Sequence, residues 1–303
     1  MPQPPMKTTS QPVIEHGDPS EKAARWIRET GTLVSPPDVC IKLFELMETE
    51  SASAQALGSV IARDPSLTAR LLRIVNSSFY GFSRRIDTVS RAVAVVGMSE
   101  LYNLVIAVSA ITSFSRIPNF IINIDTFWRH GVYSGIMARE IARRCKVLHP
   151  ERLFVAGILH DIGSLIVYNR APDAIKGLLL ASQGNETVLA RLEAQTFGFT
   201  HADLGGMLLD RWLLPNELVE AVRCHHSPAA AEQAQLEAAI LHVSEALANH
   251  CEQGAFYASP SADLLVEERA LELTGLETDQ SVLTGLAEDT REQYRDAINL
   301  FSV

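Results

Sequence analysis

Five histidines and one aspartate in the second half of the chain are the residues best suited to chemistry. They are His130, His160, Asp161, His201, His225 and His226. Imidazole nitrogens and carboxylate oxygens, without thiolates, are typical ligands of Fe, Mn, Zn or Mg. The doublet His160-Asp161 is the most informative part, because a carboxylate can bridge two cations about 4 Å apart. The sequence therefore predicts a divalent-metal site for one or two ions, to which all six residues contribute.

Helical spacing places these histidines on apolar faces. His130 precedes Met137 and Ile141 by seven and eleven residues, and His160 follows Leu153 by seven, so each shares a face with buried side chains. A buried polar group without a partner is costly in free energy. Taken singly, each histidine is more often a hydrogen-bonded core residue than a ligand. Several helices that each direct one histidine inward favour a metal site.

Phosphoester hydrolysis is the reaction that such a residue set could perform. In a two-metal site a bridging hydroxide attacks the phosphorus, and the second cation stabilises the leaving oxygen. Asp161 is then the catalytic candidate, as the bridging ligand. The sequence has no P-loop, no Gly-x-Gly-x-x-Gly after a strand, no Gly-x-Ser-x-Gly elbow and no His-Glu-x-x-His. Cys224 beside His225 is a weak alternative nucleophile, because neighbouring residues on a helix diverge by about 100°.

The elements that must position these side chains are predicted to be helices throughout, which makes the fold class all-α. Apolar residues recur at helical spacing, and no strand alternation is visible. Ser99 is expected to cap one helix, and Thr200 to cap another that begins at His201. Gly163 is expected to end the helix that carries His160.

The chain is expected to divide into four parts, with a break at Ile117-Pro118-Asn119 near the second boundary. The third part should contain five helical segments, and the fourth two closing helices near 263–274 and 279–301. The parts are a flexible N-terminal segment over 1–20, an N-terminal helical bundle over 21–115, a histidine-bearing helical subdomain over 116–252 and a C-terminal helical extension over 253–303.

The composition disfavours several classes of protein. With 303 residues, 47% of them hydrophobic, the chain can build a large core. Its formal net charge of −10 disfavours nucleic acid as a partner, since affinity for phosphates depends on clustered Lys and Arg. The cysteines form no Cys-x-x-Cys motif. No apolar run approaches the roughly 18 residues needed to cross a bilayer. We therefore expect a cytoplasmic protein without a membrane partner.

Four stretches and one histidine pair make the sequence similar to a known family. The stretches are Arg63–Leu72, Asn76–Gly81, Gly157–Gly163 and Trp212–Pro215, and the pair is His225-His226. Together they resemble the HDOD family, the HD-related output domain, within the HD superfamily of metal-dependent phosphohydrolases. The resemblance runs from about residue 33 to about residue 248. Its N-terminal stretches point to HDOD rather than to an HD enzyme.

The resemblance implies an all-α regulatory domain of bacterial signal transduction, of the kind joined to response regulators. Its N-terminal helical bundle would pack on an HD-type helical subdomain, with closing C-terminal helices. The ligand set that it implies is His130, His160, Asp161, His201, His225 and His226. The last Asp of the HD pattern falls on Glu245, whose longer side chain is open to two interpretations, a weak metal ligand or a plain solvated residue.

The sequence departs from the HD phosphodiesterases that cut cyclic di-nucleotides. Those enzymes carry Lys after Asp-Ile-Gly and a stretch with Gly-Tyr-Pro after the paired histidines. Here Ser164 and Ser227–Ala230 stand at these places. The change removes a phosphate-binding charge and a substrate loop, and so argues against hydrolysis of cyclic di-nucleotides.

Two functions therefore remain open. The favoured one is a non-catalytic signal-transduction module with a metal-capable His/Asp pocket. Such a module would pass its signal to a protein partner in the same pathway, and a small molecule or nucleotide is a further candidate ligand. The alternative is a metal-dependent phosphohydrolase that acts on a nucleotide or another phosphoester, with Asp161 as the bridging ligand.

Overall fold

The computed structural model describes residues 18–31, 37–49, 52–78, 80–114, 121–251, 264–277 and 280–301. Within these ranges the regular structure is helical and no strand is present, which confirms the all-α prediction. Helix α1 (Pro19–Glu29) opens the described part. The predicted flexible segment lies, up to residue 17, outside the described residues, and so do Phe79 and the predicted break at Ile117-Pro118-Asn119.

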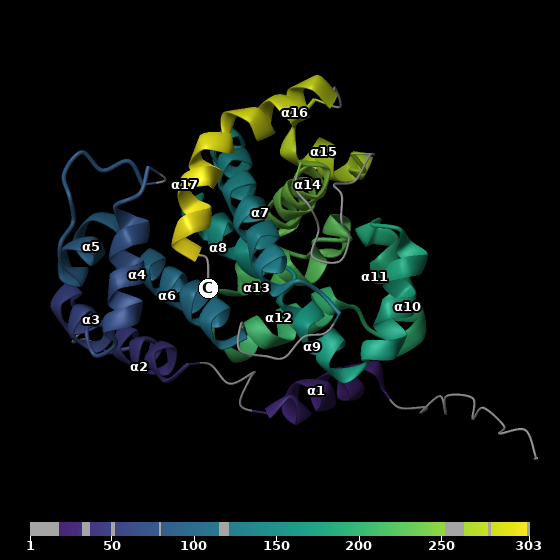
Figure 1. Cartoon of the computed structure of the whole chain (residues 1–303), viewed down its shortest axis with the longest axis horizontal. Helices are drawn as coiled ribbons and strands as arrows, with labels where there is room; N and C mark the ends of the chain where they lie inside the picture. The colour runs from purple at the N-terminus through teal and green to yellow at the C-terminus, as the bar shows by residue number, and fades with distance from the viewer. Residues whose placement is uncertain are drawn as a thin grey trace, which may run out of the picture.

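Helices α2 to α6 form a bundle at one end of the molecule (Figure 1). They are α2 (Asp38–Met47), α3 (Ala54–Ile61), α4 (Pro65–Val75), α5 (Val89–Val96) and α6 (Met98–Phe114). The side chains of Ser53, Asp64 and Thr88 accept hydrogen bonds from backbone N–H groups in the first turns of α3, α4 and α5. The cap predicted at Ser99 is wrong. Gly97, at φ 98°, turns the chain directly into α6.

Helix α7 (Ile124–Arg144) runs through the middle of the second half (Figure 1). The helices that follow it are α8 (Glu151–Leu159), α9 (Ile162–Arg170), α10 (Pro172–Ser182), α11 (Glu186–Phe197), α12 (His201–Arg211), α13 (Asn216–Cys224) and α14 (Gln235–Cys251). α8 and α14 pack on α7, and α12 packs on α9 and α13. The described chain thus has eight α-helices here, and the expectation of five segments is wrong.

Short breaks account for the additional helices. Gln183 at φ 51° and Gly198 at φ 89° end α10 and α11 in left-handed conformations. Apolar periodicity continues across such breaks and hides them. Gly163 does not end the helix of His160, because α8 already stops at Leu159 and Gly163 lies in the first turn of α9. The predicted cap at Thr200 is confirmed, as its side chain accepts from the N–H of Asp203.

Two glycines allow the helices of this half to approach closely. A Cβ atom on Gly157 of α8 would lie 2.5 Å from the Cα of Gly135 on α7. A Cβ atom on Gly163 would lie 2.0 Å from the carbonyl oxygen of His201. Because neither side chain intervenes, α8 lies directly on α7, and α9 directly on the start of α12. The histidine-bearing segments are brought together by these contacts.

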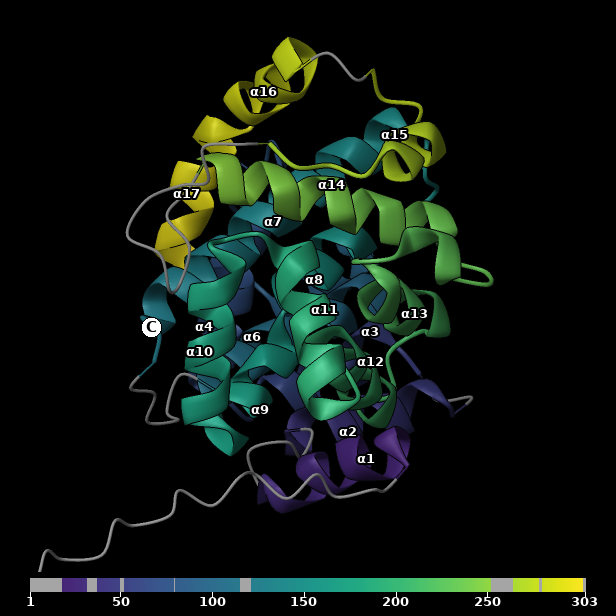
Figure 2. The same ribbon diagram turned by 90° about the vertical axis from the view of Figure 1, so that its right-hand side faces the viewer.

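Three helices close the described chain, where the sequence predicted two. They are α15 (Glu268–Thr274), α16 (Gln280–Asp289) and α17 (Arg291–Phe301). Thr290 separates the last two, with its hydroxyl bonded to the carbonyl oxygens of Leu286 and Ala287. α17 packs against both α7 and α4 (Figure 2), and so joins the two halves of the molecule.

In the described part of the chain, no single helix is long and apolar enough to cross a membrane. Only the pair α5 and α6, bent by 119°, meets that criterion when the two helices are combined. All but one of the described residues of α6 from Leu101 to Ile111 are apolar or small, and all of them are buried. Burial inside the protein core accounts for the apolar character of α6.

Candidate metal centre

The seven predicted residues converge at one place from five segments of the chain. His130 comes from α7, His160 and Asp161 from the break between α8 and α9, and His201 from the first position of α12. His225 and His226 directly follow α13, and Glu245 lies in α14. All six histidine and glutamate side chains are buried, and Asp161 is nearly so. The structure therefore assembles the predicted set, while the role of each residue as a ligand stays a prediction.

Asp161 is at the centre of the cluster. Its Oδ2 lies 3.2 Å from His160 Nε2 and 3.8 Å from His130 Nε2. Its Oδ1 lies 3.3 Å from His201 Nε2. One carboxylate thus contacts imidazoles from three separate helical segments. That is the position a bridging carboxylate requires.

Glu245 is part of the cluster and not a solvated residue. Its side chain is 3% exposed, which makes the solvated interpretation wrong. Its Oε2 lies 3.8 Å from His225 Nε2 and 3.7 Å from His226 Nδ1. The additional methylene of Glu lets α14 reach the histidine pair from the side opposite Asp161.

Backbone carbonyl groups fix the orientation of two imidazoles. His160 Nδ1 donates to the carbonyl oxygen of Gly157 at 2.7 Å, and His225 Nδ1 donates to that of Val222 at 2.6 Å. Each bond joins a histidine to a residue three positions earlier in the chain. The Nε2 atoms are consequently turned toward the interior of the cluster, as in histidines that bind metals through one nitrogen and are held by the other.

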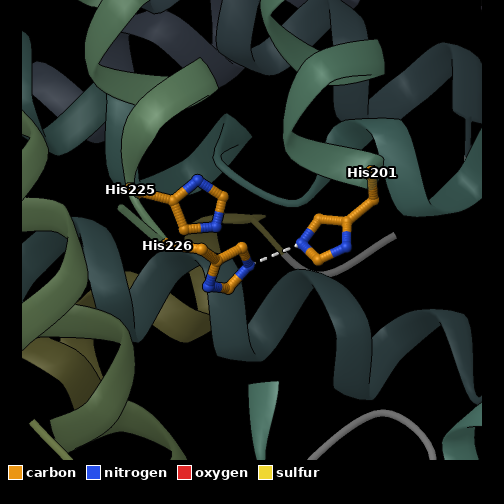
Figure 3. A group of neighbouring side chains, drawn as sticks. All are labelled: His201, His225 and His226. Carbon is orange, nitrogen blue, oxygen red and sulfur yellow. Dashed lines mark hydrogen bonds between the residues drawn. The ribbon is translucent and has the colours of Figure 1, made fainter. Parts of the chain in front are cut away.

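A buried carboxylate holds His201. Glu193 Oε2 accepts from His201 Nδ1 at 2.7 Å and from the His201 backbone N–H at 2.8 Å. His201 Nε2 lies 2.8 Å from His226 Nε2 (Figure 3). Because His201 already donates from Nδ1, its Nε2 proton can be shared with a lone pair on His226. His226 is thus the acceptor of this pair and carries its own proton on Nδ1.

Charge divides the cluster into an ionised part and a neutral part. Although burial opposes it, the charge of Asp161 raises the pKa of His160 to about 9. Against its burial, the charge of Glu193 raises the pKa of His201 well above the usual value. These two imidazoles hold the pKa of Asp161 well below its ordinary range, although burial opposes this shift too. The ionised part is therefore one carboxylate between two imidazolium groups.

The remaining side chains form the neutral part. Burial, together with the charge of His160, lowers the pKa of His130 to about 4. Burial also lowers the pKa of His225 and of His226 far below the usual value, with neighbouring imidazoles adding to the effect. Burial and the charge of Asp161 raise the pKa of Glu245 well above its usual value. Since a metal would replace the protons on His160 and His201, binding should weaken as the pH falls.

The donor atoms fit a metal ion. Within the described residues, four buried atoms of the cluster make no hydrogen bond: His130 Nδ1, His225 Nε2, His226 Nδ1 and Glu245 Oε1. Buried polar atoms without a partner are rare in native proteins. Two sets bring their ligand atoms within 4.8 Å of one another, namely His201 with His225 and His226, and His160 with Asp161, His225 and Glu245. A metal held there would supply Lewis acidity toward an oxygen ligand.

Sequence reasoning missed three polar residues around the cluster: Glu186, Glu193 and His242. Glu193 lies four residues from both Leu189 and Phe197, which are buried, so a carboxylate on an apolar face was the available signal. His242 lies near the cluster, but both of its ring nitrogens are engaged. Nδ1 donates to the carbonyl oxygen of His225 at 2.9 Å, and Nε2 accepts from the N–H of Glu267 at 3.1 Å. It therefore joins α14 to the segment before α15.

A small cavity connects the cluster with the surface. Its volume is about 30 Å³, and its lining includes Glu186, His226, Glu245 and Leu265. Ligand pockets for drug-sized molecules have volumes of roughly 300–1,000 Å³. A cavity that holds one water-sized sphere needs only about 10–15 Å³. The opening therefore has room for an ion or a water molecule and not for a nucleotide.

The two departures from the HD phosphodiesterase pattern have clear places in the structure. Ser164 is buried in the first turn of α9, where its backbone N–H donates to the carbonyl oxygen of Asp161. Residues 228–230 form a short 3₁₀ helix, η2 (Pro228–Ala230), that packs on α13 and α14. A compact turn thus occupies the place of the longer substrate loop.

Comparisons with known proteins agree with this fold. Residues 33–228 match the HDOD domain family, and the chain belongs to this family within the HD superfamily. A candidate phosphohydrolase from Shewanella amazonensis SB2B has a similar structure, with a TM-score of 0.68 and 24% identity over 92% of this chain and 97% of its own. A candidate signal transduction protein from Marinobacter aquaeolei VT8 gives a TM-score of 0.66 and 20% identity, over 94% of this chain and 66% of its own.

One curated relative is an uncharacterized protein from Treponema pallidum (strain Nichols). It is 25% identical to this chain over 203 residues, which make up 65% of this chain. The match covers 39% of the relative, so the chain spans well under half of the relative's length. The two structural likenesses lie below 25% identity and concern the fold alone.

Proposed function

We propose that this protein is a non-catalytic signal-transduction module whose His/Asp/Glu cluster binds one or two divalent metal ions. The observation that carries this proposal is the size of the cavity at the cluster, about 30 Å³. A phosphoester substrate must place its phosphorus at the metals, and a nucleotide does not fit through such an opening. A bound ion would instead cross-link α7, α8, α12 and α14 and stabilise their arrangement.

The chain's own residues support a structural or sensory role for the ion. Gly157, Gly163 and Glu193 hold the ligand-bearing segments by close packing and hydrogen bonds. Anything that binds only the folded state stabilises it in proportion to ligand occupancy. Metal loading would therefore change the stability of the helical assembly, and a protein partner that contacts its surface would receive that change as a signal. Family membership and the fold likeness to a candidate signal transduction protein support this reading.

The test is a parallel measurement of metal content and hydrolysis on the full chain. Wild type, Asp161→Ala and a control variant, His149→Ala, are each loaded with Mn, Fe or Zn and examined by elemental analysis. His149 is exposed and lies outside the cluster. We expect wild type and His149→Ala to retain metal and Asp161→Ala to lose it. We expect none of the three to hydrolyse nucleotides or cyclic di-nucleotides.

A metal-dependent phosphohydrolase is the second candidate function. The contact of Asp161 with three imidazoles at 3.2–3.8 Å is the observation that favours it. Metal-dependent turnover that disappears in Asp161→Ala would overturn the non-catalytic proposal and support this one. If wild type binds no metal while remaining folded, the cluster is a hydrogen-bonded core, and both proposals fail.

A further inference from the structure

A large cavity lies on another side of α7, away from the metal cluster. Its volume is about 530 Å³. The described residues that line it are Arg129, Tyr133, Cys251, Arg291, Tyr294, Arg295 and Ile298. This volume is within the range of roughly 300–1,000 Å³ that small-molecule sites occupy. It is more than ten times the volume of the cavity at the metal cluster.

The lining comes from one face of each of two helices. Arg291, Tyr294, Arg295 and Ile298 are spaced by three, four and seven residues from the start of α17, so they lie along one face of that helix. On α7, Arg129 and Tyr133 are four residues apart. His130, next to Arg129 in sequence, belongs instead to the metal cluster. α7 therefore serves both sites with different faces.

The cavity concentrates positive charge in an acidic protein. Three arginines line it, and no carboxylate is among its described lining residues. Nearby acidic groups of α16 and α17 are directed elsewhere. Asp289 pairs with Arg144 at 3.1 Å, and Asp296 accepts a hydrogen bond from Ser78. Gathering three guanidinium groups around one cavity is favourable when an anion joins them.

Two tyrosines form a rigid wall beside these arginines. Tyr133 and Tyr294 are 4% and 5% exposed, and their rings meet edge to face with centroids 4.7 Å apart. Arg129 Nε donates to the Tyr294 hydroxyl at 3.4 Å. Aromatic and aliphatic surface next to guanidinium groups suits a molecule with a phosphate and an uncharged organic part.

We propose that the cavity between α7 and α17 binds a phosphate-bearing small molecule of about nucleotide size. The arginines contact the phosphate groups, and the wall of Tyr133, Tyr294 and Ile298 contacts the organic part. Because α17 packs on both α7 and α4, such a ligand holds the two halves of the molecule together. The site is separate from the metal cluster, and the proposal does not depend on whether metal binds there.

Titration calorimetry of the full chain tests this proposal, with ATP, inorganic phosphate and adenosine as probes and with EDTA present to remove metals. We expect ATP to bind and adenosine not to bind. The double variant Arg291→Gln/Arg295→Gln should weaken ATP binding at least tenfold, because each charge-assisted contact contributes roughly tenfold or more in affinity. Arg28→Gln is the control, since α1 lies at the opposite end of the molecule from α17 (Figure 2).

Cysteine labelling locates the bound probe. Cys251 lines the cavity, whereas Cys224 is also half-buried but lies outside it. ATP should slow the reaction of N-ethylmaleimide with Cys251 and leave Cys224 unaffected. Asp161→Ala should change neither ATP binding nor this protection, which separates the result from the metal proposal. Unchanged ATP affinity in the arginine double variant, loss of ATP binding in Asp161→Ala, or the absence of ATP binding at millimolar concentration would each overturn the proposal.

Discussion

The two sides of α7 show two ways in which a helical protein can present polar groups. On one side, His130 joins a cluster of imidazoles and carboxylates that is almost fully buried and reaches solvent through about 30 Å³. On the other side, Arg129 joins two arginines of α17 around about 530 Å³. Buried polar groups must satisfy one another or an ion. Exposed guanidinium groups keep their hydration and can wait for a larger ligand.

The comparison assigns different tasks to the two sides. The closed side is fixed by glycine contacts and by hydrogen bonds from Gly157, Val222 and Glu193. Such a preorganised set suits an ion, whose ligands must stand at defined distances. The open side is formed by the last helix of the chain, which has fewer constraints. A change on the closed side should therefore affect stability and metal affinity most strongly.

The largest effect is expected from an added methyl group on the closed side. The Cβ of Gly163→Ala would lie 2.0 Å from the carbonyl oxygen of His201 and 2.6 Å from the backbone N of Gly205. We expect a loss of about 3 kcal/mol or more in the free energy of unfolding. Gly285→Ala in α16 is the matched control, because nothing lies within 4 Å of its Cβ. It should gain about 0.5–1 kcal/mol, and equal urea midpoints for the two variants would contradict the comparison.

The next effect concerns the carboxylate that holds His201. Glu193→Gln keeps the shape and one acceptor oxygen but removes the charge that raises the pKa of His201. We expect metal affinity to fall about 10–100-fold, the usual cost of disturbing a group that orients a ligand. Titration with Zn or Mn in a competition assay measures this change. Glu217→Gln, on the exposed side of α13, should retain wild-type affinity.

A smaller effect is expected at the other carboxylate of the cluster. Glu245→Gln should lower metal affinity by about tenfold, since one charged oxygen ligand is lost. Because burial raises the pKa of Glu245 well above its usual value, this side chain is already neutral without metal. The melting temperature of the metal-free protein should therefore stay unchanged. A drop in that temperature would show that Glu245 is ionised in the metal-free protein.

The smallest effect lies at the far end of α7, where Arg139 stands 5.7 Å from the ring of Tyr80. There Glu100 accepts from the Tyr80 hydroxyl at 3.1 Å, and burial raises the pKa of Glu100 to about 7. The folded state thus keeps a proton that the unfolded chain releases near its ordinary pKa. Stability should fall as the pH rises through the interval up to about 7.

The variant Glu100→Gln removes this titration. We expect the difference in unfolding free energy between pH 5 and pH 8 to shrink by about 1 kcal/mol, a value reduced from the full linkage because Glu100 is only partly buried. Urea unfolding at several pH values measures it, with the exposed Glu48→Gln as the control. An unchanged pH slope would show that Glu100 is ionised throughout this range.

The sequence by itself determined the all-α class, the family and the residues that assemble the closed site. Each of these follows from local information. Helical periodicity shows which face of a helix is apolar, and a histidine on that face must point inward. The spacing around His160-Asp161 and the pair His225-His226 therefore identified residues that the fold does bring together. The helix breaks were missed, because periodicity continues through a single left-handed residue such as Gln183.

Only the tertiary structure decided which partner each inward side chain meets. It placed Glu193 on His201, occupied both nitrogens of His242 and buried Glu245, where the sequence left a solvated position open. It also set the cavity between α7 and α17, whose arginines are more than 150 residues apart along the chain. Periodicity specifies a face and not its neighbour. Contacts between distant helices depend on how the whole core packs, and no local pattern records that arrangement.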